Sequence, residues 1–285
     1  MVKIYVDSRN RISGTNEDFV FQIPESIDLP DSQCYVDVVL LPNVFLTIKS
    51  GYNDKLRFRE SVVTQQGGTA TVYAHQVSIA SGQYNGITLA EAVQTAMRSV
   101  TNVTPSQLVV QYDPTKAKLK ITTTAPFDTQ FDIFPDGLLT EGTGNWNSVQ
   151  SLYPVASNSP GETQSAGDVC GFLGNILISA STSIEAFADS VVNVQRHHCC
   201  YIHSDLGVPG SSYGPRGESD IIRRIVVDAP QNGLAIDRHT TAHDTVEVGP
   251  KNLRSMKFRL AGVDGNTVDL RGHSFSFSII FHEKM

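Results

Sequence analysis

The sequence has 285 residues, which is long enough for one large β domain or two small ones with a substantial core. Apolar residues make up 40% and charged residues 18% of the chain, and 22 glycines and 13 prolines are scattered along it, which excludes disorder throughout and indicates many turns. The formal net charge of −7 gives no electrostatic reason to bind nucleic acid, so we expect no direct contact with DNA or RNA.

The N-terminal residues contain no apolar run of signal-peptide length, since Asp7, Arg9 and Arg11 interrupt it. Nowhere do about eighteen apolar residues follow one another, so no transmembrane segment is expected. We therefore expect a protein that is made and assembled inside the cell and is not secreted.

Cysteine usage agrees with an intracellular compartment. The four cysteines are Cys34, Cys170, Cys199 and Cys200. They are few for this length, and an adjacent pair cannot easily bridge to itself without strain. Reduced thiols are expected.

Alternation of apolar and polar residues recurs from end to end, which is what half-buried strands require. In chain order, the pattern appears at 19–23, 108–112, 119–121 and 256–260. It is clearest at the C-terminus, where Phe275, Phe277, Ile279 and Phe281 share one face that should be core. Turn residues, namely Asp113-Pro114 and the stretch 264–266, predict antiparallel pairing.

One amphipathic helix interrupts the strands. Apolar residues recur at helical spacing at Leu89, Val93, Ala96, Met97 and Val100. The residue before them is Thr88, and Glu91 follows three positions later, which predicts a capped N-terminus at Thr88. We expect this helix to connect strands and to lie across a sheet.

The stretch at about 125–182 is rich in Gly, Ser, Thr, Asn and Pro and is predicted to be a long insertion. A second glycine-rich stretch covers 204–219. The expected fold is all-β, with one domain over 1–285 that carries these loop insertions.

A serine motif at 210–214, Gly-Ser-Ser-Tyr-Gly, matches the turn that presents a nucleophile in α/β-hydrolases. Pro209 precedes it and Pro215 follows it, so neither the strand nor the helix that this turn needs can flank Ser212 closely. We interpret the motif as a loop, and no catalytic residue is predicted.

Five residues suggest a metal site, because imidazole and thiolate are the usual zinc ligands. They are His197, His198, Cys199, Cys200 and His203. If 191–203 is a strand, His197, Cys199 and His203 face one way and His198 and Cys200 the other. No CxxC or HExxH spacing accompanies them. We expect buried cysteines and cross-strand histidine contacts, with no metal and no cofactor.

Other charged and polar motifs have plain interpretations. His239 and His243 are predicted to lie in a polar loop. The basic patch of Arg216, Arg223 and Arg224 is expected to be a solvated face or to form inter-subunit salt bridges.

Two short motifs are set aside. The sequon at 102–104, Asn-Val-Thr, needs a secretory route that the sequence does not predict. The triplet Arg216-Gly217-Glu218 differs from the receptor-binding Arg-Gly-Asp by one methylene, so no receptor site is assigned to it.

Four stretches resemble the minor capsid proteins, or pentons, of Polinton-like elements, virophages and related large DNA viruses. The stretches are 6–11 with 18–24 and 35–45, 82–84 running into the helix at Leu89, 201–206 with 221–227, and 253–260 with 265–266 and 275–277.

The resemblance implies a single jelly roll of about eight strands in two antiparallel sheets. It further implies a structural protein of the virion that forms homopentamers at icosahedral vertices and abuts a double-jelly-roll major capsid protein. The residues of the inter-subunit interface are unknown at this stage.

Two alternatives remain open. A receptor- or glycan-binding β-sandwich, such as a fibre or lectin-like module, would use Trp146 as its anchor. An enzyme would require Ser212 or the His197 region to be catalytic despite the contexts above.

Overall fold

The computed structural model describes residues 1–62, 68–69, 71–124, 130–134, 166–172, 176–179, 185–195, 197–208, 210, 212–238 and 245–284. The chain is mostly β and divides into two compact units. Unit 1 comprises Met1–Phe45 and His197–Met285, and unit 2 comprises Leu46–Arg196. The strands of both units show the same alternation of apolar and polar residues, so this pattern does not mark the boundary between the units.

Unit 1 contains two antiparallel sheets. Sheet one has the strand order β1-β17-β4-β14, with β15 also paired to β4, and sheet two has the order β13-β12-β16-β3-β2. The strand bounds are β1 Val2–Asp7, β2 Ser13–Gly14, β3 Asp18–Leu29, β4 Ser32–Pro42, β12 Cys199–Ser204, β13 Ile221–Val226, β14 Leu234–Arg238, β15 Val246–Glu247, β16 Lys251–Gly262 and β17 Ser276–Glu283. The expected strands near both ends of the chain are confirmed.

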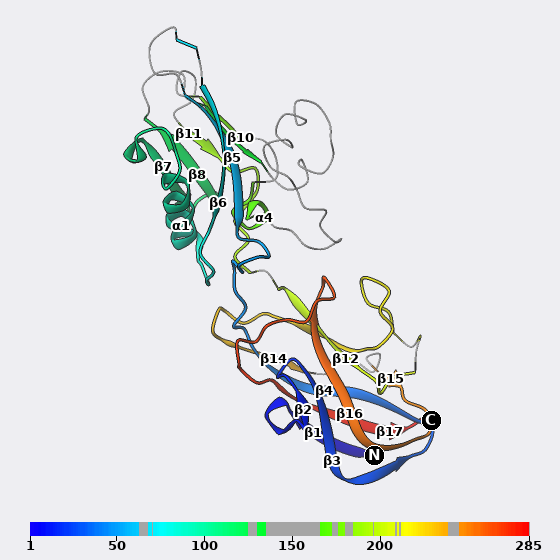
Figure 1. The fold of residues 1–285 in the computed structure, drawn as a ribbon. Helices are drawn as coiled ribbons and strands as arrows, with labels where there is room; N and C mark the ends of the chain where they lie inside the picture. Colours follow the sequence, from blue (N-terminus) through cyan, green and yellow to red (C-terminus); the bar gives the residue numbers. More distant parts are fainter. Residues whose placement is uncertain are drawn as a thin grey trace. The chain divides into compact units, whose positions relative to one another are not determined.

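The strands of unit 1 pair from the ends of the chain inward. The first strand β1 pairs with the last strand β17, and β3 pairs with β16. Strand β4 pairs with β14, and β12 pairs with β13. Figure 1 shows the blue N-terminal strands beside the orange and red C-terminal strands. Most partners are therefore far apart in sequence.

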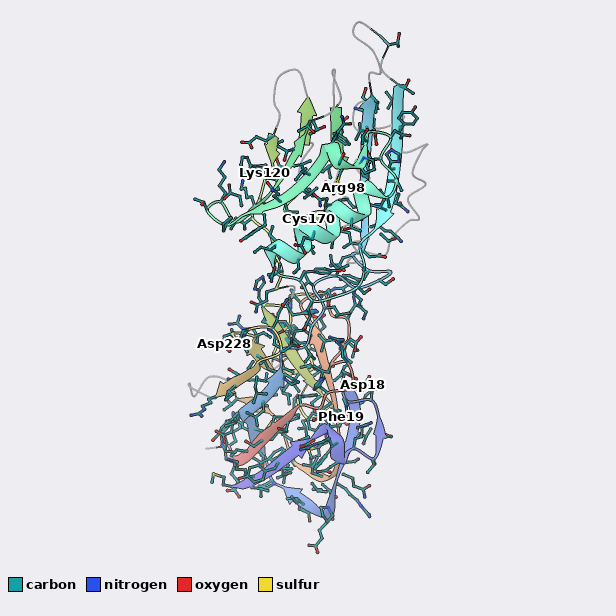
Figure 2. All side chains as sticks on the ribbon, turned by 90° about the vertical axis from the view of Figure 1, so that its left-hand side faces the viewer. Asp18, Phe19, Arg98, Lys120, Cys170 and Asp228 are labelled. Carbon is teal, nitrogen blue, oxygen red and sulfur yellow. The ribbon has the colours of Figure 1, made fainter. Side chains whose placement is uncertain are left out.

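The core of unit 1 is built around aromatic rings. The ring of Phe19 lies 5.7 Å from that of Phe258 and 5.9 Å from that of Phe275, and Phe258 meets Phe277 edge-on at 5.0 Å. Such tilted and edge-to-face pairs are favourable beyond their buried area. Phe19 is labelled in Figure 2. The four apolar residues that alternate along the last strand are all buried, as expected.

Unit 2 has its own core, with sheet orders β10-β9-β5-β6 and β11-β8-β7. Its elements are β5 Lys55–Val62, β6 Thr71–Ser78, α1 Gly86–Arg98, β7 Leu108–Asp113, β8 Lys118–Thr123, β9 Gln130–Phe134, α4 Gly167–Cys170, β10 Ile176–Ser179 and β11 Glu185–Phe187. Short 3-10 turns occupy Ser8–Asn10 in unit 1 and Pro105–Gln107 in unit 2.

Helix α1 lies against strand β7, as the expected connection across a sheet would. Leu89, Val93 and Met97 are fully buried. The expected N-cap at Thr88 is wrong, because the capping residue is Asn85. The Asn85 side chain accepts from the Thr88 N–H, and the Thr88 hydroxyl oxygen accepts from the Asn85 N–H. Threonine can replace Glu in this reciprocal arrangement because its hydroxyl reaches the same N–H.

The expected insertion at about 125–182 lies largely outside the described residues. The described parts of this stretch contain β9, α4 and β10. Strand β9 pairs with both β5 and β10, and its Phe131 and Ile133 are fully buried. Phe131 and Ile133 of β9 and Val169 and Cys170 of α4 belong to the core of unit 2.

The separate cores generate a prediction. Phe258→Ala removes a fully buried ring from unit 1 and should lower its free energy of unfolding by about 3–5 kcal/mol. Amide hydrogen exchange should accelerate in peptides of unit 1 and stay unchanged in unit 2. Phe131→Ala is the matched control and should produce the reverse pattern. Faster exchange in both units for either variant would contradict independent cores.

Candidate interaction surface

The histidine and cysteine residues near position 200 lie in different surroundings. The strand expected over 191–203 is wrong in extent, because β12 begins only at Cys199. Cys200 is fully buried, whereas His198 is exposed. A register shift between Ile202 and His203 disturbs the alternation. Across the described residues, no three His, Cys, Asp or Glu side chains gather to hold a metal ion.

Two of these histidines have structural contacts. His203 is buried, and its Nδ1 lies 2.7 Å from Oδ1 of Asp220. The ring of His197 meets the ring of Phe45 edge-on at 4.8 Å. Both histidines therefore contribute to the packing of unit 1.

Ser212 of the Gly-Ser-Ser-Tyr-Gly motif has a structural role. Its hydroxyl donates to the main-chain carbonyl of Ile221, the first residue of β13. This hydrogen bond uses the proton that a general base would have to remove from a nucleophile. The serine thus ties its loop to sheet two.

The expected basic patch is divided, and its solvated interpretation is wrong for Arg223. The Arg223 Nε donates to Asp237 Oδ2 at 2.7 Å, and the guanidinium also donates to the Arg238 carbonyl. Only 6% of the Arg223 side chain is exposed, so the pair links β13 of sheet two to β14 of sheet one inside the unit. Arg224 is exposed, and Arg216 donates to the carbonyl of Asp264.

Two residues of the sequon, Asn102 and Val103, donate main-chain N–H groups to a buried carboxylate in unit 2. Glu60 is fully buried, and its Oε1 accepts from the main-chain N–H groups of Asn102 and Val103 at 2.7 and 3.0 Å. The Nε2 of His75 lies 3.0 Å from Oε2 of Glu60. These contacts satisfy a carboxylate that would otherwise be costly to bury.

Several sequence candidates lie outside the described residues. They are Trp146, His239 and His243.

The triplet Arg216-Gly217-Glu218 forms a tight turn, in which Gly217 has a φ of 87° and donates to the carbonyl of Gly214.

An exposed apolar surface covers the outer side of sheet one. We define the sheet-one face by Tyr5, Val38, Leu40, Leu234 and Ile236. Tyr5 is 73% exposed, and Leu234 and Ile236 are about half exposed. Leu40 lies opposite Ile236 on the neighbouring strand, and Ser278 lies between Tyr5 and Val38. These side chains therefore line one continuous surface.

The sheet-one face is hollowed. Tyr5, Val38 and Leu40 line a depression of about 470 Å³, together with the small residues Ser276 and Ser278. Short serine side chains on β17, flanked by larger side chains on β1 and β4, explain the hollow. A surface of this kind can accept a protruding apolar side chain.

Two charged groups on the β1 side of the sheet-one face are paired within the chain, whereas Arg238 on β14 is exposed opposite Val38. Lys3 Nζ lies 2.8 Å from Asp37 Oδ2, and this hydrogen bond raises the pKa of the Lys3 ammonium. Arg9 donates to both carboxylate oxygens of Asp7, which lowers the pKa of Asp7. These pairs neutralise the β1 side of the face.

The sequence carries a signal for this surface that the alternation of apolar and polar residues does not include. The run 38–41 reads Val-Val-Leu-Leu, and a continuous apolar run predicts a strand that is covered on both sides. Val39 and Leu41 face the core, whereas Leu40 is exposed on the outer side.

Unit 2 carries a second depression, of about 560 Å³, between α1 and the β7–β8 hairpin. It is lined by Ile87 and Tyr112 and by the charged residues Glu91, Asp113 and Lys120. Figure 2 labels Lys120. The mixed charges of this groove favour no single ligand class.

Among the described residues, no helix is both long enough and apolar enough to cross a membrane.

The sequence matches no protein-family model and no curated protein. Its fold is similar to that of the selenomethionine-labelled mavirus penton protein, known from a crystal structure. The similarity has a TM-score of 0.52 at 10% sequence identity and covers 99% of both chains. The chain therefore has the fold of this penton protein over both of its units.

The burial of the thiols generates a prediction. Burial raises the pKa of Cys34 and of Cys170 to about 12, and it also raises that of Cys200. Since the thiolate is the reactive form, these three should not react with an aromatic disulfide reagent in the folded chain at about pH 8. The partly exposed Cys199 should react in the monomeric chain.

Denaturation should expose the three buried thiols to the reagent. The absorbance of the leaving group measures how many thiols have reacted. The control is Cys199→Ser, which should abolish the reaction of the folded chain. Rapid labelling of that variant would show that a buried cysteine is accessible.

Proposed function

We propose that this chain is a structural capsid protein that forms pentamers at the vertices of an icosahedral shell, beside a double-jelly-roll major capsid protein. The observation that carries the proposal is the similarity to a penton protein over 99% of both chains, because it includes unit 2 as well as the sandwich. A fold alone does not specify a function, so the strand order, the residue contacts and the surface of the chain carry weight as well.

The strand order of unit 1 supports a single jelly roll. A jelly roll arises when a long antiparallel ribbon is folded into two packed sheets. Its strands then pair from the ends inward, as do β1 with β17, β3 with β16, β4 with β14 and β12 with β13. Unit 2 would then be an insertion between the third and fourth strands of the roll, β4 and β12.

The contacts of the candidate catalytic residues support a structural role. Ser212 and His203 have partners that hold loops and strands of unit 1 together. The proposal therefore assigns no catalytic residue and no cofactor to this chain. It places the protein in the virion, after assembly inside the host cell.

The ring geometry makes a physical demand on the surface. Contacts around a fivefold axis are heterologous, so each copy needs two different and complementary lateral surfaces. An apolar surface such as the sheet-one face meets this demand on one side. No covalent chemistry or bound metal is required for such a contact.

The proposal predicts the mass of the assembled protein. Light scattering of the purified chain should give about five times the 31.0 kDa of one copy, with ring-shaped particles in negative stain. A stable trimer would contradict the penton assignment and favour a fibre or receptor-binding module. If the free chain is a monomer, shells assembled with the major capsid protein provide the test, and vertices that lack the chain would refute the proposal.

A further inference from the structure

We propose that the sheet-one face of each copy packs against sheet two of the next copy, where Cys199, Val226 and Val263 form the complementary patch. This inference rests on the proposed function and deepens it, because it assigns the two lateral surfaces of the ring. We name Cys199, Val226 and Val263 the sheet-two patch.

The first support is the extent of exposed apolar surface on sheet one. Tyr5, Leu40, Leu234 and Ile236 come from three strands, β1, β4 and β14, that lie in one sheet. Single exposed apolar residues are common on protein surfaces, whereas a continuous patch across several strands marks a contact surface. Tyrosine is enriched in such contacts because it supplies a large area at low entropic cost.

The second support is charge. Each copy carries a formal net charge of −7, so identical copies repel one another unless their contact surfaces are neutral or complementary. Lys3 is paired with Asp37 at the border of the sheet-one face, and Asp7 is paired with Arg9. A second copy can therefore cover the β1 side of this face without burying an unpaired charge, and it must leave the exposed Arg238 on β14 in solvent or supply a carboxylate to it.

The third support is the existence of a second apolar patch on the other sheet of the same unit. Val226 is 49% and Val263 is 48% exposed. Cys199 lies opposite Val226, and Cys200 lies opposite Gly262, the neighbour of Val263. The ends of β13, β12 and β16 thus bring these residues together.

The two patches lie on different sheets of unit 1, which is the arrangement that a heterologous ring contact requires. A twofold dimer would need only one self-complementary patch. Since one unit carries both halves of the contact, a second copy of this chain is the occupant that the structure favours over an unrelated protein.

The test places a carboxylate in each patch. Ile236→Glu changes the sheet-one face, and Val226→Glu changes the sheet-two patch. Both side chains are about half exposed in the single chain, so the variants should fold, which circular dichroism and thermal melting check. Each variant should weaken ring association about tenfold or more and shift the mass measured by light scattering toward a monomer.

Ile12→Glu is the matched control. Ile12 is 60% exposed and precedes β2, at the edge of sheet two farthest from β13. This variant carries the same new charge on unit 1 and should assemble like the unmodified chain.

A mixture of the two interface variants tests the pairing itself. The Ile236→Glu chain keeps an intact sheet-two patch, and the Val226→Glu chain keeps an intact sheet-one face. Equal amounts should therefore form one good contact and stop at a dimer, with a mass of about twice 31.0 kDa. A mixture that stays monomeric would show that the two patches do not contact each other.

Other outcomes separate this inference from the proposed function. Pentamers that persist unchanged in Ile236→Glu would overturn the assignment of the sheet-one face and leave the pentamer intact. A trimer of the unmodified chain that Ile236→Glu dissociates would retain the surface and overturn the penton. An unmodified chain that does not self-associate even at millimolar concentration would overturn the contact between copies.

Discussion

The antiparallel ladder between the first and last strands is the interaction on which unit 1 depends. Six residue pairs, from Val2 with Phe281 to Asp7 with Ser276, join β1 to β17. This ladder brings both ends of the chain into one sheet, and unit 2 lies within the loop that it closes. The entropic cost of closing a loop rises only slowly with the length of the loop. A unit of this size can therefore be accommodated between β4 and β12. Pairings between such distant residues predict slow folding.

The same ladder determines which side chains can serve assembly. Alternation in β17 directs Phe277, Ile279 and Phe281 into the core and leaves Ser276 and Ser278 on the outer side. The outer side of sheet one is then shaped by its neighbours, Tyr5 on β1 and Leu40 on β4. A structural role of this kind needs surface shape and neutralised charge. The buried Arg223–Asp237 pair has a different task, because it links the two sheets inside the unit.

The strands and the helix could be predicted because their signals are local. Alternation at 275–281 and at 108–121 corresponds to β17 and to the β7–β8 hairpin, and helical spacing around Leu89 corresponds to α1. The predicted N-cap of the helix was wrong because both Asn85 and Thr88 have side chains that can cap a helix N-terminus. The strand expected over 191–203 was too long because histidines and cysteines are compatible with loop and strand alike.

The sequence by itself determined the predominance of β-strands and the core-facing residues of the periodic strands, since both follow from spacing along the chain. Only the tertiary structure decided the division at Phe45 and His197, the burial of Arg223 and the composition of the sheet-one face. Tyr5, Leu40 and Ile236 are separated by up to most of the chain and become neighbours only through the pairing of β1, β17, β4 and β14. Periodicity reports which way one strand faces. Strand order reports what lies beside it, and this order depends on long-range pairing that no local pattern encodes.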